Sequence, residues 1–226
     1  MPRPVLMPEY LSDAGDEIMK LTSASFLTDQ PIPEQFAFGA PDPVLHVRLA
    51  ANHNPQLKWS GAPAQTRSYA LICVDGDVPT KPDDVNKEGR VVPASLPRGK
   101  FYHWAMVDIP AAVSEIAAGE CSNGVVAGGK KELRGPRGAR QGVNDYTGWF
   151  ANDADMAGTY RGYDGPCPPW NDMIVHHYQF TLYALGIERV GVEGDFTAPQ
   201  VLDAIKRHVL AEATLVGTYS LNPGVK

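Results

Sequence analysis

Cysteine is scarce in this 226-residue chain, and its three copies, Cys73, Cys121 and Cys167, stand far apart. An odd number of widely spaced cysteines excludes a disulfide framework and a zinc-finger-type site. The first residues, Met1–Pro4, lack the apolar core of a secretory signal. We therefore expect a reduced, cytoplasmic protein.

Long apolar runs and long runs of one charge are also missing. The longest clean apolar run, Tyr69–Val74, is too short to cross a bilayer, so no transmembrane segment is expected. The formal net charge of −6 repels the phosphate backbone of nucleic acids, so nucleic-acid binding is not expected. The largest basic cluster, Lys130–Arg140, is broken by glycine and proline and is typical of a solvated loop. A local pocket for one small anion is compatible with this charge.

Glycine and proline are abundant instead, with 22 and 20 copies, and 43% of the residues are hydrophobic. This composition is typical of a globular protein, and the many turn formers favour β structure over a helix bundle. No internal repeat or linker divides the sequence. We predict one domain over residues 1–226, with an irregular N-terminal leader at 1–16.

Apolar residues recur with the period of two that is typical of strands. The predicted strands are 18–27, Val44–Ala51, Arg67–Asp75, Phe101–Ile109, His176–Ile187 and Ala213–Leu221. Ala70–Val74 is apolar on both faces, which predicts a central strand covered on both sides. One helix is predicted from Thr197 through Val209, because Thr197–Gln200 forms a capping box.

Three long segments separate these elements, namely Thr80–Lys100, Gly124–Arg140 and Thr147–Val175. Loops of this length in a compact domain usually carry function.

Acidic and histidine side chains occur on three of the predicted strands. Asp75 falls where the first central strand ends, His103 lies within the next, and His176 opens the third. If the strands are neighbours, these side chains meet at one place. Taken alone, the aspartate is typical of a turn, and each histidine is typical of a hydrogen-bonded core residue. The grouping is what points to a site.

Five short motifs occur between Leu57 and the C-terminus. They are Asp75-x-Asp77-x-Pro79, His103-Trp104 followed by Met106–Pro110, Gln141–Asp145, Gly165–Pro169, and His176-x-Tyr178 running on to Leu185. In this order they resemble the phosphatidylethanolamine-binding proteins, also called Raf-kinase-inhibitor-like proteins, in their bacterial form. No single motif is specific, so the order carries the resemblance.

The resemblance implies a mostly β fold of two antiparallel sheets, one large and central and one smaller, with a few peripheral helices. It also implies a small pocket for phosphate, acetate or a phospholipid head group, with no cofactor and no metal. The pocket residues that carry over are Asp75, His103, His176, Tyr178, Pro79, and Pro168 or Pro169. The supporting residues are Asp77, Trp104, Asn144, Asp145, Gly165 and Cys167.

The sequence departs from the family pattern in three ways. Gly76 stands where the family usually has proline, and His177 stands where it usually has arginine. Strand alternation predicts that His177 points to the opposite face from His176. The segments 80–100 and 149–162 look like insertions that close over the pocket.

The expected pocket has a chemistry that suits anions. Two histidines, Tyr178 and loop backbone N–H groups would supply several hydrogen-bond donors to a phosphate. We therefore expect non-enzymatic binding of a small anion that strengthens as the pH falls from 8 to 6. The resemblance further admits a kinase or protease partner regulated through this pocket, and a homodimer.

A metal-dependent hydrolase is the first alternative. Asp75, His103 and His176 form a two-histidine, one-carboxylate set of the kind that binds zinc or iron. The His-x-x-x-His spacing of many such sites is missing.

Covalent catalysis is the second alternative, with Cys167 as nucleophile and His176 as its base. The prolines on both sides of Cys167 favour a structural role for this cysteine.

Overall fold

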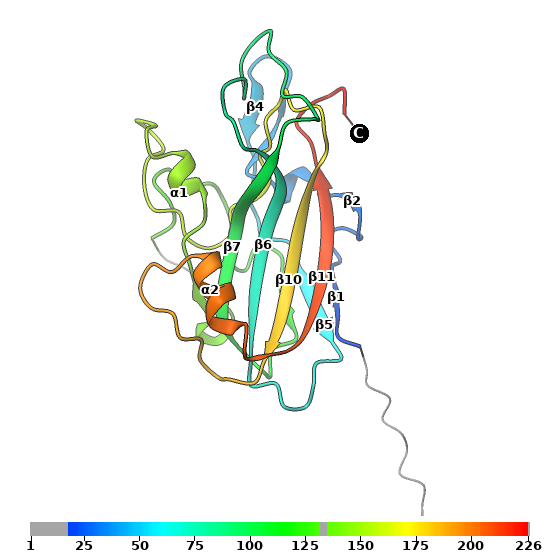
Figure 1. The fold of residues 1–226 in the computed structure, drawn as a ribbon, viewed down its shortest axis with the longest axis vertical. Helices are drawn as coiled ribbons and strands as arrows, with labels where there is room; N and C mark the ends of the chain where they lie inside the picture. The colour runs from blue at the N-terminus through cyan, green and yellow to red at the C-terminus, as the bar shows by residue number, and fades with distance from the viewer. Residues whose placement is uncertain (1–17, 132–134, 226) are drawn as a thin grey trace, which may run out of the picture.

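The computed structural model describes residues 18–131 and 135–225, which fold around one large β-sheet (Figure 1). The predicted leader at 1–16 lies outside the described residues. The strands are β1 (Lys20–Thr22), β2 (Gln30–Pro31), β3 (Gly39–Asp42), β4 (His46–Leu49), β5 (Leu57–Ser60), β6 (Ser68–Pro79), β7 (Arg98–Pro110), β8 (Glu115–Ile116), β9 (Arg140–Gln141), β10 (His176–Leu185) and β11 (Val209–Tyr219). The helices are α1 (Tyr146–Trp149), α2 (Ala198–Ile205) and the short 3-10 turns η1 (Glu34–Phe36) and η2 (Pro136–Gly138).

The large sheet has six strands in the order β2-β11-β10-β6-β7-β9. All neighbours are antiparallel except β2, which pairs with β11 in parallel. The four long strands stand side by side in Figure 1, from β7 in green to β11 in red. A smaller sheet, β1-β5-β8, and the β3–β4 hairpin complete the strands. The predicted architecture is confirmed, with the hairpin as an addition.

Both faces of the large sheet are buried over part of its area, which explains the apolar run at Ala70–Val74. On one face Leu71 packs in the main core, which also contains Leu57 of the smaller sheet. On the other face Ala70 and Ile72 pack in a second core with α2 and the segment before it. The strand β6 therefore contributes apolar side chains to both cores, one core on each face of the sheet.

The helix α2 begins as the capping box predicts. The backbone N–H of Thr197 donates to Gln200 Oε1 at 2.8 Å, and Val201 and Ile205 face the second core. The predicted extension to Val209 is wrong, because the helix ends at Ile205 and Val209 opens β11 by pairing with Leu185.

Several other strand boundaries also differ from the prediction, and two of them bear on the fold. Within the segment 18–27 only Lys20–Thr22 is a strand, because the side chain of Ser23 turns to the carbonyl of Gln56 and the chain leaves the ladder. The strand β6 continues through Pro79 instead of ending at Asp75. Its pairing with β7 shifts register between Asp75 and Val78, which is a bulge that re-aims the strand.

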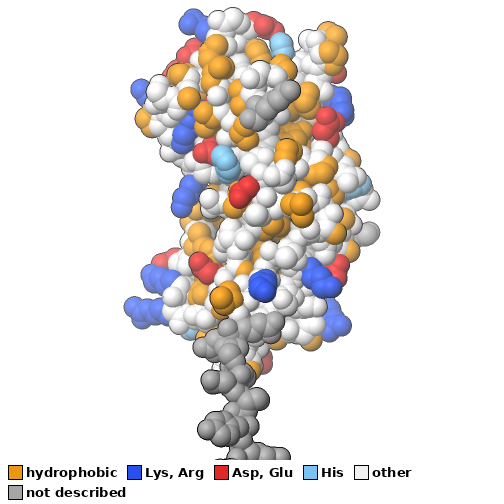
Figure 2. Space-filling model, turned by 90° about the vertical axis from the view of Figure 1, so that its right-hand side faces the viewer, with side chains coloured by type: hydrophobic (Ala, Val, Ile, Leu, Met, Phe, Trp, Pro, Cys, Tyr) orange, Lys and Arg blue, Asp and Glu red, His pale blue; other side chains and the backbone are white. Residues whose placement is uncertain are grey.

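Side chains of both charges are interspersed on the face next to β1 and β2 (Figure 2). This pattern agrees with the small net charge. Within the described ranges, no helix is both long and apolar enough to cross a membrane.

Candidate functional site

A cavity of about 260 Å³ lies where β6 and β7 meet the β3–β4 hairpin and helix α1. Its walls are mainly apolar and aromatic, with contributions from Phe38, Val47, Val78, Phe101, Tyr146 and Phe150. The polar side chains that line it include Asp75, His103 and Tyr178, which we call the floor triad. The triad comes from three neighbouring strands, β6, β7 and β10. The sequence pattern grouped Asp75 and His103 with His176, which lies two residues before Tyr178 on β10.

Asp75 is buried at the bulge of β6, where both of its carboxylate oxygens are engaged. Oδ1 accepts the backbone N–H of Asp77 at 2.8 Å, and Oδ2 lies 2.7 Å from Nδ1 of His176. Strand register places Asp75 opposite Tyr178 on one side and Phe101 on the other. The bulge and the pairing together fix this carboxylate at the cavity.

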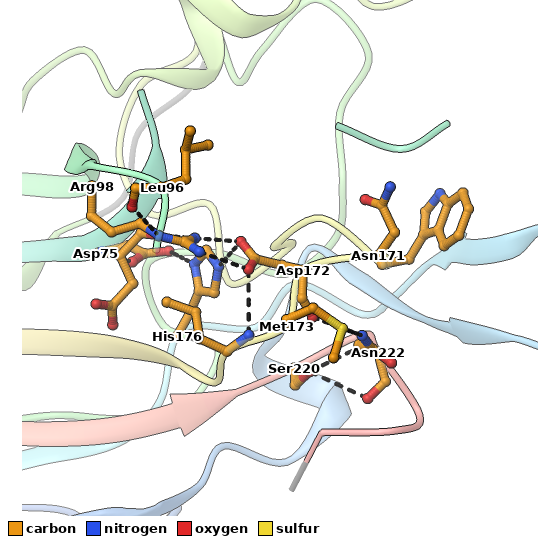
Figure 3. Close-up of polar contacts among 12 residues, drawn as sticks. Asp75, Leu96, Arg98, Asn171, Asp172, Met173, His176, Ser220 and Asn222 are labelled. Atoms are coloured by element: carbon orange, nitrogen blue, oxygen red, sulfur yellow. Dashed lines mark hydrogen bonds and ion pairs between the residues drawn. The ribbon is translucent and has the colours of Figure 1, made fainter. Parts of the chain in front are cut away.

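His176, which was predicted to line the pocket, lies behind Asp75 and outside the cavity wall. The ring is fully buried between two carboxylates, because its Nε2 also lies 3.1 Å from Oδ2 of Asp172 (Figure 3). Burial opposes a charge here, but the hydrogen bonds and charges of Asp172 and Asp75 outweigh it and raise the pKa of His176 to about 9. His176 is therefore an imidazolium that has no nitrogen free for a ligand.

Asp172 is in turn held by Arg98. Two guanidinium nitrogens of Arg98 contact the two oxygens of Asp172, at 2.5 and 3.0 Å (Figure 3). Burial acts to raise the pKa of Asp172, but the hydrogen bonds from His176 and Arg98 lower it overall. Asp75, His176, Asp172 and Arg98 thus form a chain of alternating charges whose formal sum is zero. Sequence reasoning missed Asp172 and Arg98, which belong to the long segments rather than to a motif.

His103 is buried on β7 and differs from His176 in its charge. Its Nδ1 lies 2.8 Å from the backbone carbonyl of Asp164, which can only accept, so Nδ1 carries the hydrogen. Burial is the main influence on the pKa of His103 and lowers it, although Asp75 acts in the opposite direction. The ring is therefore neutral near pH 7, and its Nε2 is an acceptor. Both histidines were expected to act as donors, whereas a neutral His103 presents an acceptor at Nε2.

Tyr178 completes the floor triad. Its ring meets that of His103 edge-on, with centroids 5.1 Å apart, and its hydroxyl is buried. It makes no hydrogen bond of standard geometry among the described residues, but the Asp75 carboxylate interacts with it. Burial and the charge of Asp75 raise the pKa of Tyr178 well above its usual range, so the hydroxyl keeps its proton as a donor.

A buried polar cluster behind His103 holds the floor in place. Asp164 is fully buried and accepts from Lys130, Asn52 and Asn144 at 2.5, 2.7 and 2.8 Å. Its backbone N–H also donates to the carbonyl of His103, at 3.1 Å. Asn144 was predicted as a support, whereas Asp164 was missed although it directly precedes the Gly165–Pro169 motif.

Three other predicted supports make hydrogen bonds to neighbouring segments. Asp77 accepts from the backbone N–H and the ring of His177, which is exposed on the opposite face from His176 as predicted. Asp145 accepts the N–H of Tyr102 at 2.8 Å and ties α1 to β7. Trp104 points to the main core, where its indole N–H donates to Gln141.

The Gly165–Pro169 segment forms one side of the cavity. Pro169 and Cys167 line the cavity together with Pro79, whereas Pro168 is buried outside its wall. Burial raises the pKa of the Cys167 thiol to about 12. Cys167 is thus a protonated wall residue, and His176, its hypothesised base, is already engaged by two carboxylates.

The two predicted insertions both reach the cavity. Pro82, Val85 and Asn86 of the first, with Trp149 and Phe150 at the start of the second, are wall residues. Asn171 fastens the first insertion, because its side-chain amide donates to the carbonyl of Asp84 at 2.8 Å and accepts from the N–H of Asn86 at 3.0 Å.

A metal site at Asp75, His103 and His176 would need their lone pairs to converge on one point. Both nitrogens of His176 and one of His103 are already engaged within the protein. Over residues 18–131 and 135–225, no cluster of three or more His, Cys, Asp or Glu side chains is placed to hold a metal ion. Asp75 and His176 belong to one hydrogen-bonded chain, whereas His103 is bonded to the backbone of Asp164.

Comparison with known proteins agrees with this architecture. Residues 22–220 match the family model described as phosphatidylethanolamine-binding protein. The UPF0098 protein YbcL of Escherichia coli is 30% identical over 75% of this chain and 73% of its own length. A UPF0098 protein of Methanothermobacter thermautotrophicus is 34% identical over 74% of this chain and 83% of its own length.

Solved structures show the same relationship. The crystal structure of Escherichia coli YbcL, described as a new member of the mammalian PEBP family, has a TM-score of 0.64 and 26% identity over 89% of this chain and 98% of that one. CT736 of Chlamydia trachomatis has a TM-score of 0.61 and 27% identity over 90% and 98% of the two chains.

Proposed function

This chain belongs to the phosphatidylethanolamine-binding protein family, and we propose that its cavity binds a small ligand with an oxyanion head group without transforming it. The observation that carries the proposal is a polar floor, Asp75, His103 and Tyr178, beneath apolar and aromatic walls. Such a pocket suits a head group attached to an apolar body.

The charge balance beneath the floor supports an anionic head group. Asp75 alone would repel an oxyanion, but the His176 imidazolium lies 2.7 Å away and compensates it. Asp172 is compensated by Arg98 in the same way. An anion at the floor therefore meets a neutral set of buried charges and the donor hydroxyl of Tyr178.

A binding role is also supported by the state of the reactive groups. Catalysis by Cys167 would need a thiolate, and burial keeps its pKa at about 12. His176 cannot serve as the base for Cys167, because both of its ring nitrogens are bonded to carboxylates. The three cysteines are unpaired, which agrees with the reduced, cytoplasmic setting that we propose for the protein.

Calorimetric titration with phenyl phosphate and inorganic phosphate tests the proposal. We expect binding by the wild-type protein that strengthens as the pH falls from 8 to 6, because the neutral Nε2 of His103 can share a proton with the head group. His103→Ala should weaken binding about tenfold or more, the effect of losing one charge-assisted hydrogen bond.

His208→Ala is the matched control, because His208 is exposed and follows α2, far from the floor. Circular dichroism of each variant separates lost binding from lost folding. Absence of binding by the wild-type protein, or full affinity in folded His103→Ala, would contradict the proposal.

A further inference from the structure

Resting on the proposed function, we propose that the pocket selects oxyanions that carry a proton. The favoured head group is the singly protonated phosphate of a monoester. Sulfate esters and phosphodiesters, which have no such proton at neutral pH, are disfavoured. The geometry behind this selectivity is an acceptor nitrogen, Nε2 of His103, at the floor beside the donor hydroxyl of Tyr178.

The acceptor character of His103 is imposed by its second nitrogen. The backbone carbonyl of Asp164 lies 2.8 Å from Nδ1 and has no hydrogen to give. The hydrogen of the neutral ring must therefore reside on Nδ1, and Nε2 presents a lone pair. The carbonyl cannot change its role, because Asp164 is fully buried and fixed by Lys130 and Asn144.

The surroundings of His103 keep this ring neutral until a ligand brings a proton. The titratable groups that face the ring are Asp75 on β6, Tyr178 on β10, Tyr146 on α1, and Asp145 and Asp164 from the flanking segments. The carboxylates among them favour a charged ring, but its burial is the larger influence and favours the neutral form. Tyr146 is already committed, since its hydroxyl donates to the carbonyl of Gly165 at 2.8 Å.

Donors for the other oxygens of the head group lie in the same cavity. Tyr178 lines the cavity, and its buried hydroxyl, which lies near Asp75, makes no hydrogen bond of standard geometry among the described residues. Asn86 is a wall residue whose side-chain oxygen accepts the N–H of Trp170 at 3.0 Å, so its NH₂ group can turn to a ligand. A head group with one donor and several acceptor oxygens therefore matches the site.

The proton requirement discriminates among common oxyanions. A phosphate monoester has a second pKa of about 6, so it carries a proton at little cost near neutral pH. A carboxylate with a pKa of about 4 carries one in only about a thousandth of its molecules at pH 7. Sulfate esters and phosphodiesters lack the proton altogether, and they leave Nε2 facing an oxygen lone pair. Phospholipid head groups that are phosphodiesters fall in this disfavoured class.

Competitive calorimetry with three matched phenyl compounds tests this selectivity. Phenyl phosphate, phenyl sulfate and phenyl methyl phosphate share the ring, and at pH 5.5 the main form of each carries a single negative charge. We expect phenyl phosphate to bind about 10- to 100-fold more tightly than the other two, the range for one charge-assisted hydrogen bond and a repulsion avoided. Equal affinities would overturn the inference and leave the proposed function intact, whereas binding of none of the three would overturn the proposed function itself.

Two variants assign the selectivity to the floor. His103→Gln replaces the acceptor with an amide that can also donate, so the preference for phenyl phosphate over phenyl sulfate should fall toward one. Tyr178→Phe should weaken both ligands alike, and His208→Gln is the matched control. An unchanged preference in folded His103→Gln would contradict the assignment.

Proton uptake by the wild-type protein gives a readout that needs no variant. Titrations at pH 5.5 in buffers of different ionisation enthalpy should show uptake approaching one proton per phenyl sulfate bound, because His103 must become charged to donate. Binding of phenyl phosphate should be accompanied by little proton uptake, because this ligand is already protonated. Equal uptake for the two ligands would overturn the inference.

Discussion

Two histidines on strands that flank β6 have opposite charge states because of what their second nitrogen contacts. His176 lies between two carboxylates and is charged, whereas His103 lies against a backbone carbonyl and is neutral. Motif reasoning treated the two rings as equivalent donors. The difference in charge between the two rings depends on Asp172 and on the backbone of Asp164. Neither contact could be predicted from the spacing of these residues in the sequence.

The charge on His176 should make stability depend on pH. The folded pKa is raised to about 9 from an ordinary value of about 6.5, so the stabilising effect is fully present below pH 6.5 and is lost as the pH rises through 9. The loss has an upper bound of about 3 kcal/mol. Urea unfolding at pH 6.5 and 9.5 measures it.

His176→Gln is the comparison protein for this prediction, because it keeps a polar side chain that cannot titrate. The wild-type protein should lose more stability than His176→Gln between the two pH values. Identical pH dependence in the two proteins would show that His176 is not charged in the folded state.

At the scale of elements, the strands were predictable and the connecting segments were not. Alternation of apolar residues located β6, β7 and β10, and it correctly placed His177 opposite His176. The bulge at Asp75 was not predicted, because it depends on the register against β7. The walls of the cavity come from loops whose contacts, such as those of Asn171, join residues more than eighty positions apart.

The Gly165–Pro169 segment is held so closely that its first residue has no room for a side chain. A Cβ on Gly165 would lie 2.1 Å from the carbonyl oxygen of Phe36. Gly165→Ala should therefore shift the segment, destabilise the fold by about 1–3 kcal/mol and weaken binding. Thermal unfolding and phenyl phosphate titration check both effects.

Gly148→Ala provides the matched control, because nothing lies within 4 Å of the added methyl group and the residue belongs to helix α1. This variant should be as stable as the wild-type protein or slightly more so. Equal stability of the two alanine variants would mean that the Gly165 contact relaxes without cost.

At the scale of the whole molecule, Asp164 joins segments that are distant in the sequence. Asn52, Lys130 and Asn144 all donate to its carboxylate. Its backbone N–H donates to β7, and its backbone carbonyl accepts from β7. A residue with so many long-range partners could not be identified from its neighbours. The family resemblance located the adjacent Gly165–Pro169 motif but gave this aspartate no role.

Removing the only cationic donor to Asp164 among the described residues should be costly. Lys130→Met would leave a buried carboxylate without its compensating charge, which typically costs about 3–5 kcal/mol. Adding Asp164→Asn to the same chain should recover part of that loss, because the remaining partner is then neutral. Urea unfolding at neutral pH measures all three proteins.

Lys206→Met is the matched control, since Lys206 and its partner Asp203 are both exposed. Its effect should stay within about 0.5 kcal/mol. A loss for Lys130→Met no larger than that of the control would contradict a buried ion pair at Asp164.

The contacts that shape the pocket also close an edge of the sheet. The strand β9 covers only Met106 and Val107 of β7. Farther along β7, the carbonyls of Tyr102 and His103 accept backbone N–H groups from Asp145 and Asp164. Without those segments, this stretch of β7 would present unpaired donors and acceptors to other chains, the arrangement from which aggregation by strand addition begins. The segments that flank the cavity therefore also protect this edge of the sheet, so a change that loosens them should promote self-association.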